Sequence, residues 1–145
     1  MQWNTLSLTE KQEALALLSI RLASAAAFLY HGTHILGIIG GPGIQNFARF
    51  THLSVPIAFL VGLGELCGGL AMLTGVLARL GGGVISIIML GAIVLVHWSK
   101  GFDITNNGYE YALTQLLIGV AILIRGAGPI SLVEWFRAKQ TTQSS

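Results

Sequence analysis

The stretch VPIAFLVGLGELCGGLAMLTGVL, residues Val55 to Leu77, decides the fold of this chain. Its 23 residues hold one acid, Glu65, and the stretch is long and apolar enough for an α-helix to cross a hydrocarbon core of about 30 Å. Glu65 stands close to the middle of the stretch, so we predict that it lies near the mid-plane of a membrane. An ionisable side chain at that depth is costly and generally faces other helices rather than lipid.

Two interpretations of Glu65 are open. Gly62, Gly64, Gly68 and Gly69 surround it, and the G-x-x-x-G spacing of Gly64 and Gly68 lets a neighbouring helix approach closely. Glu65 is then either a protonated acid that is hydrogen-bonded between helices, or a group with a chemical function. Further polar residues predicted at compatible depths favour a function.

The composition indicates a polytopic membrane protein of one domain. The 145 residues are 53% hydrophobic and 10% charged, whereas soluble globular domains are about 25% charged. The formal net charge is +2, but Lys and Arg are scattered singly, so the charge gives no indication of nucleic-acid binding. A single cysteine, Cys67, excludes an internal disulfide and any C-x-x-C redox or metal motif.

The pattern of apolar runs predicts an all-α fold, an integral membrane four-helix bundle. The spans are expected at about 13–38, 55–77, 80–98 and 110–125; the first three are near the length that a bilayer requires or longer, and the fourth is short for it. Thr9 and Gln12 have the spacing of a capping box, which would begin the first helix. Pro56 suits the first turn of the second span.

Two segments outside the spans are predicted to lie at the membrane surface. Ile44, Phe47 and Ala48 have the spacing of a short helix, which would form an interfacial lid over the exoplasmic end of the bundle. Ser131 and Glu134 have capping-box spacing and would begin a short C-terminal interfacial helix. Residues 1–139 would then form a single domain, and the polar residues 140–145 a disordered tail.

Ionisable residues in the first span give the first functional hypotheses. Arg21 lies about 10 Å in from the start of the apolar run, by the helical rise. Its guanidinium either snorkels to the interface or reaches Glu65 in a salt link. His31 and His34 share a helix face near the opposite surface, and Gly32 between them leaves room for a flat group against the backbone.

A third histidine, His97, is predicted at the same depth as His31, since each lies about 25 Å along its span. Glu110 and Tyr111 open the fourth span on the same side. Metal binding by His31 and His34 is not predicted, because no carboxylate accompanies them and no Glu-x-x-His motif occurs.

The distribution of positive charge predicts the topology. One end of the bundle would carry Lys11, Arg79, Arg125, Arg137 and Lys139, with Arg21 nearby, and the other end only Arg49 and Lys100. By the positive-inside rule, both termini would be cytoplasmic in a multi-pass protein of the cell inner (plasma) membrane. The histidines would then face the exoplasmic side.

The chain resembles the DoxX family of small four-helix bacterial membrane proteins over about residues 21–132. The resemblance is carried by the order and spacing of several motifs: Arg21-Leu22, His31-Gly32, Glu65-Leu66-Cys67-Gly68-Gly69-Leu70, Leu73-Thr74-Gly75-Val76-Leu77-Ala78-Arg79, Gly101-Phe102, Gly108-Tyr109-Glu110-Tyr111, Gly128-Pro129 and Ser131-Leu132. It implies a membrane bundle associated with redox chemistry. Members of this family are linked to quinone-coupled sulfur oxidation, as membrane subunits of thiosulfate:quinone oxidoreductase, and to quinone or oxidative-stress responses.

Three functions follow as hypotheses. In the first, the protein is a quinone-interacting subunit of a quinone-dependent oxidoreductase: His31, His34, Gly32, His97, Glu110 and Tyr111 would bind the quinone, and Glu65 and Arg21 would relay protons or tune charge. No haem, flavin or iron–sulfur motif is recognisable, so the electrons would come from a membrane-bound or peripheral oxidoreductase partner. The alternatives are a structural or assembly subunit of a larger membrane complex and a proton-coupled small-molecule transporter; a homo-oligomer is also left open.

Overall fold

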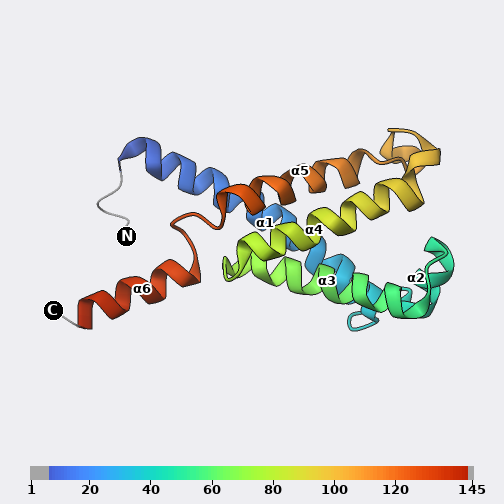
Figure 1. Ribbon diagram of the computed structural model, residues 1–145, viewed down its shortest axis with the longest axis horizontal. Helices are drawn as coiled ribbons and strands as arrows, with labels where there is room; N and C mark the ends of the chain where they lie inside the picture. Colours follow the sequence, from blue (N-terminus) through green and yellow to red (C-terminus); the bar gives the residue numbers. More distant parts are fainter. Residues whose placement is uncertain (1–6, 144–145) are drawn as a thin grey trace.

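The computed structural model describes residues 7–143, which fold into six α-helices with no β-strand among them (Figure 1). The helices are α1 (Leu8–Leu36), α2 (Gly43–Thr51), α3 (Val55–Thr74), α4 (Ala78–Ala92), α5 (Glu110–Arg125) and α6 (Leu132–Gln143). The all-α prediction is therefore confirmed. Residues 1–6 and 144–145, which include the end of the predicted polar tail, lie outside the described residues.

Three helical segments are long and apolar enough to cross a membrane: Leu8–Leu36, Val55–Thr74 and Ala78–Lys100. The prediction of four such spans is confirmed only for these three. The helix α5 has 16 residues, which corresponds to about 24 Å of helix against the ~30 Å of a hydrocarbon core. It nevertheless packs along α4 as the fourth helix of the bundle (Figure 1).

Glycines set the distances between the helices. A Cβ atom on Gly32 of α1 would lie 2.6 Å from the backbone nitrogen of Leu66 in α3, and one on Gly82 of α4 would lie 2.6 Å from the Gly119 carbonyl oxygen in α5. At Gly68 a Cβ would lie 2.9 Å from Ile85 of α4. The predicted close approach at Gly64 and Gly68 is thus the α3–α4 contact, and glycine is needed because isoleucine side chains of α4 fill the space beside both positions.

The beginnings of the helices follow capping rules, with one correction. The capping box of α1 pairs Ser7 with Glu10, whereas the sequence suggested Thr9 and Gln12. Ser7 and Glu10 have the same three-residue spacing two residues earlier, and a carboxylate is a stronger acceptor than an amide. The Ser131 hydroxyl accepts from the Glu134 N–H at 3.3 Å, as predicted.

The C-terminal helix extends beyond its predicted end. The sequence predicted a disordered tail from Gln140, but α6 continues to Gln143. Extending an existing helix fixes one residue for each hydrogen bond gained, so a polar segment readily continues it. The Thr141 hydroxyl also donates to the Arg137 carbonyl oxygen at 3.0 Å.

The end of the bundle opposite α6 carries two connections that meet. The helix α2 packs on α3 and α1, which confirms the short helix predicted there. After α4 the chain forms a π-helical turn, Ile93–His97, then two 3₁₀ turns, Trp98–Lys100 and Ile104–Asn106. The Lys100 ammonium lies 5.4 Å from the Phe50 ring centre, so both connections lie at one end.

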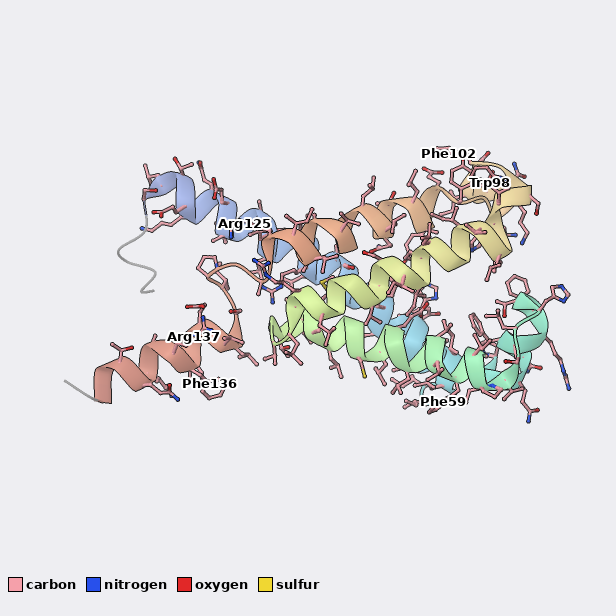
Figure 2. The ribbon with its side chains drawn as sticks, in the orientation of Figure 1. Phe59, Trp98, Phe102, Arg125, Phe136 and Arg137 are labelled. Atoms are coloured by element: carbon pink, nitrogen blue, oxygen red, sulfur yellow. The ribbon has the colours of Figure 1, made fainter. Side chains whose placement is uncertain are left out.

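Side chains on the outside of the bundle are largely apolar. Phe59, Leu60, Ile87 and Ile124 are exposed, and Figure 2 shows Phe59 projecting away from α3. The interior holds small or polar groups as well as apolar ones, including Arg21, Ser24, Glu65 and Gln115. This distribution is typical of a protein whose solvent is lipid, because polar groups there must find partners inside the bundle.

Candidate functional site

Arg21 is buried, and its guanidinium donates to four backbone carbonyl oxygens. Nε donates to Met72 at 2.9 Å, Nη2 to Leu73 at 3.2 Å, and Nη1 to Ala127 and Ile130 at 2.8 Å each. With 1% of its surface exposed, it does not snorkel. The predicted salt link to Glu65 is also wrong, because the last carbonyls of α3 and the α5–α6 linker present several acceptors to one guanidinium.

Glu65 faces the middle of the bundle. On α3, Gly62 and Gly69 lie against α1, while Gly64 and Gly68 lie against α4. At 3.6 residues per turn, Glu65 falls between these two faces. It is 6% exposed, and its Oε2 atom has no hydrogen-bond partner in the described structure.

The Glu65 carboxyl interacts with a residue of α5, which in turn lies near a residue of α1. Tyr111 of α5 lies close enough for direct electrostatic interaction with Glu65, and its buried hydroxyl also lacks a hydrogen-bond partner among the described residues. The ring of His31, on α1, lies 6.0 Å from the Tyr111 ring, centre to centre. Three of the predicted site residues therefore gather from three helices, and two of them present unsatisfied oxygen atoms.

Two residues that the sequence reasoning missed extend this cluster. The Ser24 hydroxyl of α1 donates to the Gln115 side-chain carbonyl of α5 at 3.0 Å, and both residues are buried. Gln115 also approaches the Tyr111 hydroxyl, although the geometry does not make a hydrogen bond. The sequence spacing could have identified both residues. Ser24 precedes His31 by seven positions and Gln115 follows Tyr111 by four, so each pair lies on one helix face.

The space beside Gly32 is filled by protein. The backbone of α3 at Gly62 and Leu66 occupies the position that the sequence suggested for a flat group. The side chain of His34 contacts its own helix: its Nδ1 pairs with the Tyr30 carbonyl oxygen at 2.8 Å, and its ring lies 3.9 Å from the Tyr30 ring. Gly32 lies against the α3 backbone at Leu66, next to Glu65, and the close packing there leaves no space for a flat group.

His97 and Glu110 hold the loop between α4 and α5. The Nδ1 atom of His97 pairs with the Asn107 carbonyl oxygen at 2.7 Å, and a Glu110 carboxylate oxygen accepts from the Ile104 N–H at 3.2 Å. The π-helical turn that ends at His97 was not predicted from the sequence, although such turns frequently occur at functional sites. Both side chains are satisfied by the loop rather than directed at Glu65.

The same loop contains an acid outside the membrane-spanning segments. Asp103 accepts hydrogen bonds of 2.8 Å from both the backbone N–H and the hydroxyl of Thr105. These hydrogen bonds hold the pKa of Asp103 below its ordinary value of 3.8. The ionised form of Asp103 is thus part of the loop structure.

Metal ligation has no geometric basis among residues 7–143, where no group of three or more His, Cys, Asp or Glu side chains converges. The single Cys67 is exposed on α3. The chemistry that the cluster can perform is hydrogen bonding and proton transfer, with a phenol, an imidazole and a carboxyl as the acting groups.

Comparison with known proteins identifies the family. No curated protein and no solved structure matches the chain significantly. The DoxX family model matches residues 16–98, more than half of the chain, from within α1 to just past the π-helical turn. Arg21, His31 and Glu65 lie in the matched region, whereas Tyr111 and Gln115 lie beyond it. The chain belongs to the DoxX family.

Proposed function

We propose that this membrane protein binds a quinone or quinol beside Glu65, between α1 and α5, and works as a redox-associated subunit with an oxidoreductase partner. The proposal rests on one observation: two buried oxygen atoms, Glu65 Oε2 and the Tyr111 hydroxyl, have no hydrogen-bond partner among residues 7–143. Leaving a buried polar group unpaired costs about 1–3 kcal/mol. A ligand with polar oxygen atoms would recover that free energy.

The packing around the cluster supports entry from the membrane. The helix pairs α1–α3 and α4–α5 pack extensively, whereas α1 and α5 touch at few positions. His31 is exposed on α1 and faces the Tyr111 ring across this seam. A lipid-soluble molecule moving in the bilayer would meet His31 first and Tyr111 behind it.

The side chains present suit a quinone. Such a group supplies two-electron, two-proton chemistry at its two oxygen atoms when bound. The Tyr111 hydroxyl and a ring N–H of His31 would each donate a hydrogen bond, which is what a carbonyl oxygen accepts. Glu65 would hold a proton at its carboxyl oxygen and exchange it as the charge of the site changes. The Ser24–Gln115 hydrogen bond fixes the amide next to Tyr111.

The other residues of the predicted quinone site are better explained as structural. Gly32 contacts α3, His97 and Glu110 secure the loop, and Arg21 binds carbonyl oxygens. These contacts also favour the second candidate, a structural or assembly subunit, because they show that polar residues in this bundle can serve packing alone. The experiment must therefore separate ligand binding from folding.

The test is purification in nanodiscs, followed by solvent extraction and mass spectrometry of the lipid-soluble molecules that accompany the protein. Glu65→Gln and Tyr111→Phe are expected to lower the quinone content by at least about fivefold, because each removes a polar group from the site. Glu13→Gln and Tyr109→Phe are the matched controls and should keep it. Equal quinone content in all four variants, with unchanged thermal stability, would rule out the site, and a ligand-free protein in a larger complex would support the structural candidate.

We also propose that both termini are cytoplasmic. Arg125 and Arg137 lie at one end of the bundle, and Trp98 and Phe102 at the other (Figure 2). The basic residues Arg79, Arg125 and Arg137 line one cleft, while the opposite end has Arg49 and Lys100. The positive-inside rule then assigns the cleft to the cytoplasm. Reporter fusions at each terminus test this, and periplasmic activity of either fusion would reverse it.

A further inference from the structure

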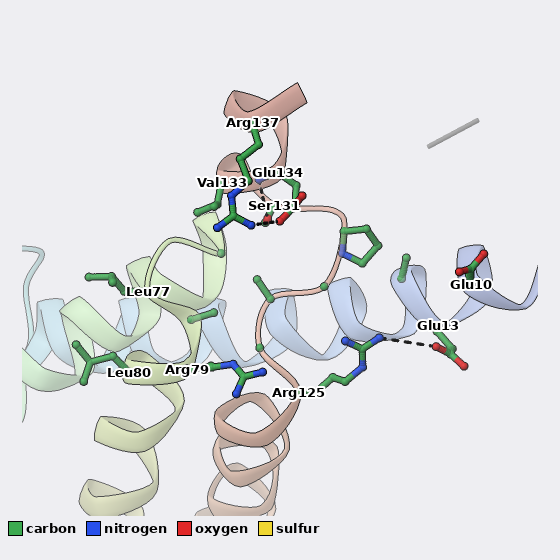
Figure 3. Close-up of a pocket in the computed structure, with 17 residues that line it drawn as sticks. Glu10, Glu13, Leu77, Arg79, Leu80, Arg125, Ser131, Val133, Glu134 and Arg137 are labelled. Atoms are coloured by element: carbon green, nitrogen blue, oxygen red, sulfur yellow. Dashed lines mark hydrogen bonds and ion pairs between the residues drawn. The ribbon is translucent and has the colours of Figure 1, made fainter. Parts of the chain in front are cut away.

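A cleft of about 750 Å³ opens at the end of the bundle away from Glu65 (Figure 3). Its walls are the first turns of α1, the turn between α3 and α4, the linker between α5 and α6, and the start of α6. We propose that this cleft binds the phosphate group of an anionic phospholipid. Its arginines, its apolar flank and the linker support this assignment, and none of them belongs to the proposed quinone site.

Three arginines and three carboxylates line the cleft, but they are not equally paired. Arg137 donates to Glu134 at 2.7 Å. The Glu10 carboxylate accepts a hydrogen bond from the Ser7 N–H in the capping box of α1. Arg125 lies 3.9 Å from Glu13, and both side chains are more than half exposed. Such a pair contributes little and is readily exchanged for a better anion.

Arg79 has no carboxylate partner within residues 7–143. Its side chain lies across the backbone of Gly126: a Cβ there would lie 3.2 Å from the Arg79 Nε. Gly126 also has a φ of +81°, which a side chain rarely tolerates. Close packing on the linker thus holds the Arg79 side chain at the wall of the cleft, which Arg125 also lines (Figure 3). Two guanidinium groups at one site match the geometry of phosphate.

The linker contributes backbone donors. Because Ala127 and Ile130 direct their carbonyl oxygens to Arg21, the N–H groups of Gly128 and Ser131, on the same trans peptide bonds, point away from Arg21. Gly128 and Ser131 both line the cleft. The buried arginine thereby fixes the conformation of the linker, and two of its residues with outward-facing N–H groups lie at the cleft wall.

The flank of the cleft favours a lipid over a soluble anion. Leu77 and Leu80, on the α4 side of Arg79 in Figure 3, are 68% and 63% exposed. Exposed leucines beside arginines, at the end of membrane-spanning helices, suit a ligand with a charged head and an apolar chain. Basic pockets at the ends of transmembrane helices recognise anionic lipid headgroups in this way.

Native mass spectrometry of the full chain, purified in detergent and supplied with phosphatidylglycerol or phosphatidylcholine, tests the proposal. The wild type should retain phosphatidylglycerol in preference to phosphatidylcholine, and the Arg79→Gln/Arg125→Gln variant should retain at least roughly tenfold less of it. The matched control, Arg49→Gln/Lys100→Gln, removes two cations from the opposite end and should behave as the wild type.

A second arm measures thermal unfolding with inorganic phosphate alone. Stabilisation of the wild type but not of Arg79→Gln/Arg125→Gln by phosphate, without lipid retention, would keep the phosphate site and assign it a soluble ligand. If neither probe binds, or if both double variants lose lipid equally, the proposal is overturned. Quinone content should be the same in both double variants, so the outcome is separate from that of the Glu65 site.

Discussion

The Nε atom of Arg21 donates a hydrogen bond of 2.9 Å to the carbonyl oxygen of Met72, 51 positions later in the chain. Met72 lies in the last turn of α3, where carbonyl oxygens have no partner within the helix. The same guanidinium also donates hydrogen bonds to the carbonyl oxygen of Leu73 and to two carbonyl oxygens of the linker that follows α5. One buried cation therefore joins three parts of the bundle, and its position close to the helix end complements the helix dipole.

Arg21→Met should destabilise the protein by at least about 3 kcal/mol, because several buried carbonyl oxygens lose their donor at once. Arg21→Lys should recover only part of the loss, since an ammonium lacks the planar fork that reaches all four acceptors. Thermal unfolding in detergent measures this, with the exposed Arg49→Met as control. Wild-type stability in Arg21→Met would show that the network is not needed for folding.

Gly32→Ala should destabilise the α1–α3 contact by roughly 1–3 kcal/mol, since the new methyl group would overlap the Leu66 backbone. Gly91→Ala is the matched control, because nothing lies within 4 Å of the Cβ position there. It should be neutral or slightly stabilising, as alanine favours a helix. Equal effects of both substitutions on the unfolding temperature would contradict the close approach at Gly32.

The Ser24–Gln115 hydrogen bond should appear as an energetic coupling between α1 and α5. A double-mutant cycle with Ser24→Ala and Gln115→Met is expected to give about 0.6 kcal/mol, the average for hydrogen bonds between membrane helices. Titration from a mild into a denaturing detergent measures the free energy of unfolding of the wild type, the two single variants and the double variant. Strict additivity would mean that the two side chains do not stabilise each other.

Asp103 should make the loop between α4 and α5 sensitive to acid. Its pKa is lower in the folded loop than in the unfolded chain, so its contribution is fully present above the ordinary value of 3.8 and is lost as the pH falls through the lowered pKa. Amide exchange at Thr105, corrected for the intrinsic rate, should therefore increase in strong acid. Asp103→Asn keeps an acceptor oxygen but does not titrate, and an identical pH profile in this variant would refute the assignment.

Several features of the fold could be predicted from the sequence because they depend on local patterns. Apolar length set the spans that begin near Leu8 and Val55, Gly64 and Gly68 indicated a close helix contact, and Ser131 marked the start of α6. The exact capping box of α1 was missed, since Ser7 and Thr9 are both acceptable caps and only the backbone decides between them. The bounds predicted for the fourth span, 110–125, coincide with those of α5.

In the candidate site, too, some features follow from the local sequence and others only from the packing of the helices. The sequence by itself determined that Glu65 is an acid inside a membrane-spanning helix, because length and polarity are properties of one segment. Only the tertiary structure decided that Tyr111 interacts with Glu65, that His31 and Gln115 lie beside Tyr111, and that Arg21 binds elsewhere. Depth along a helix follows from counting residues, whereas the partner of a buried polar group depends on how helices rotate and pack against one another. Arg21 illustrates the difference, since backbone carbonyl oxygens, which every residue carries and no sequence pattern reveals, are its partners.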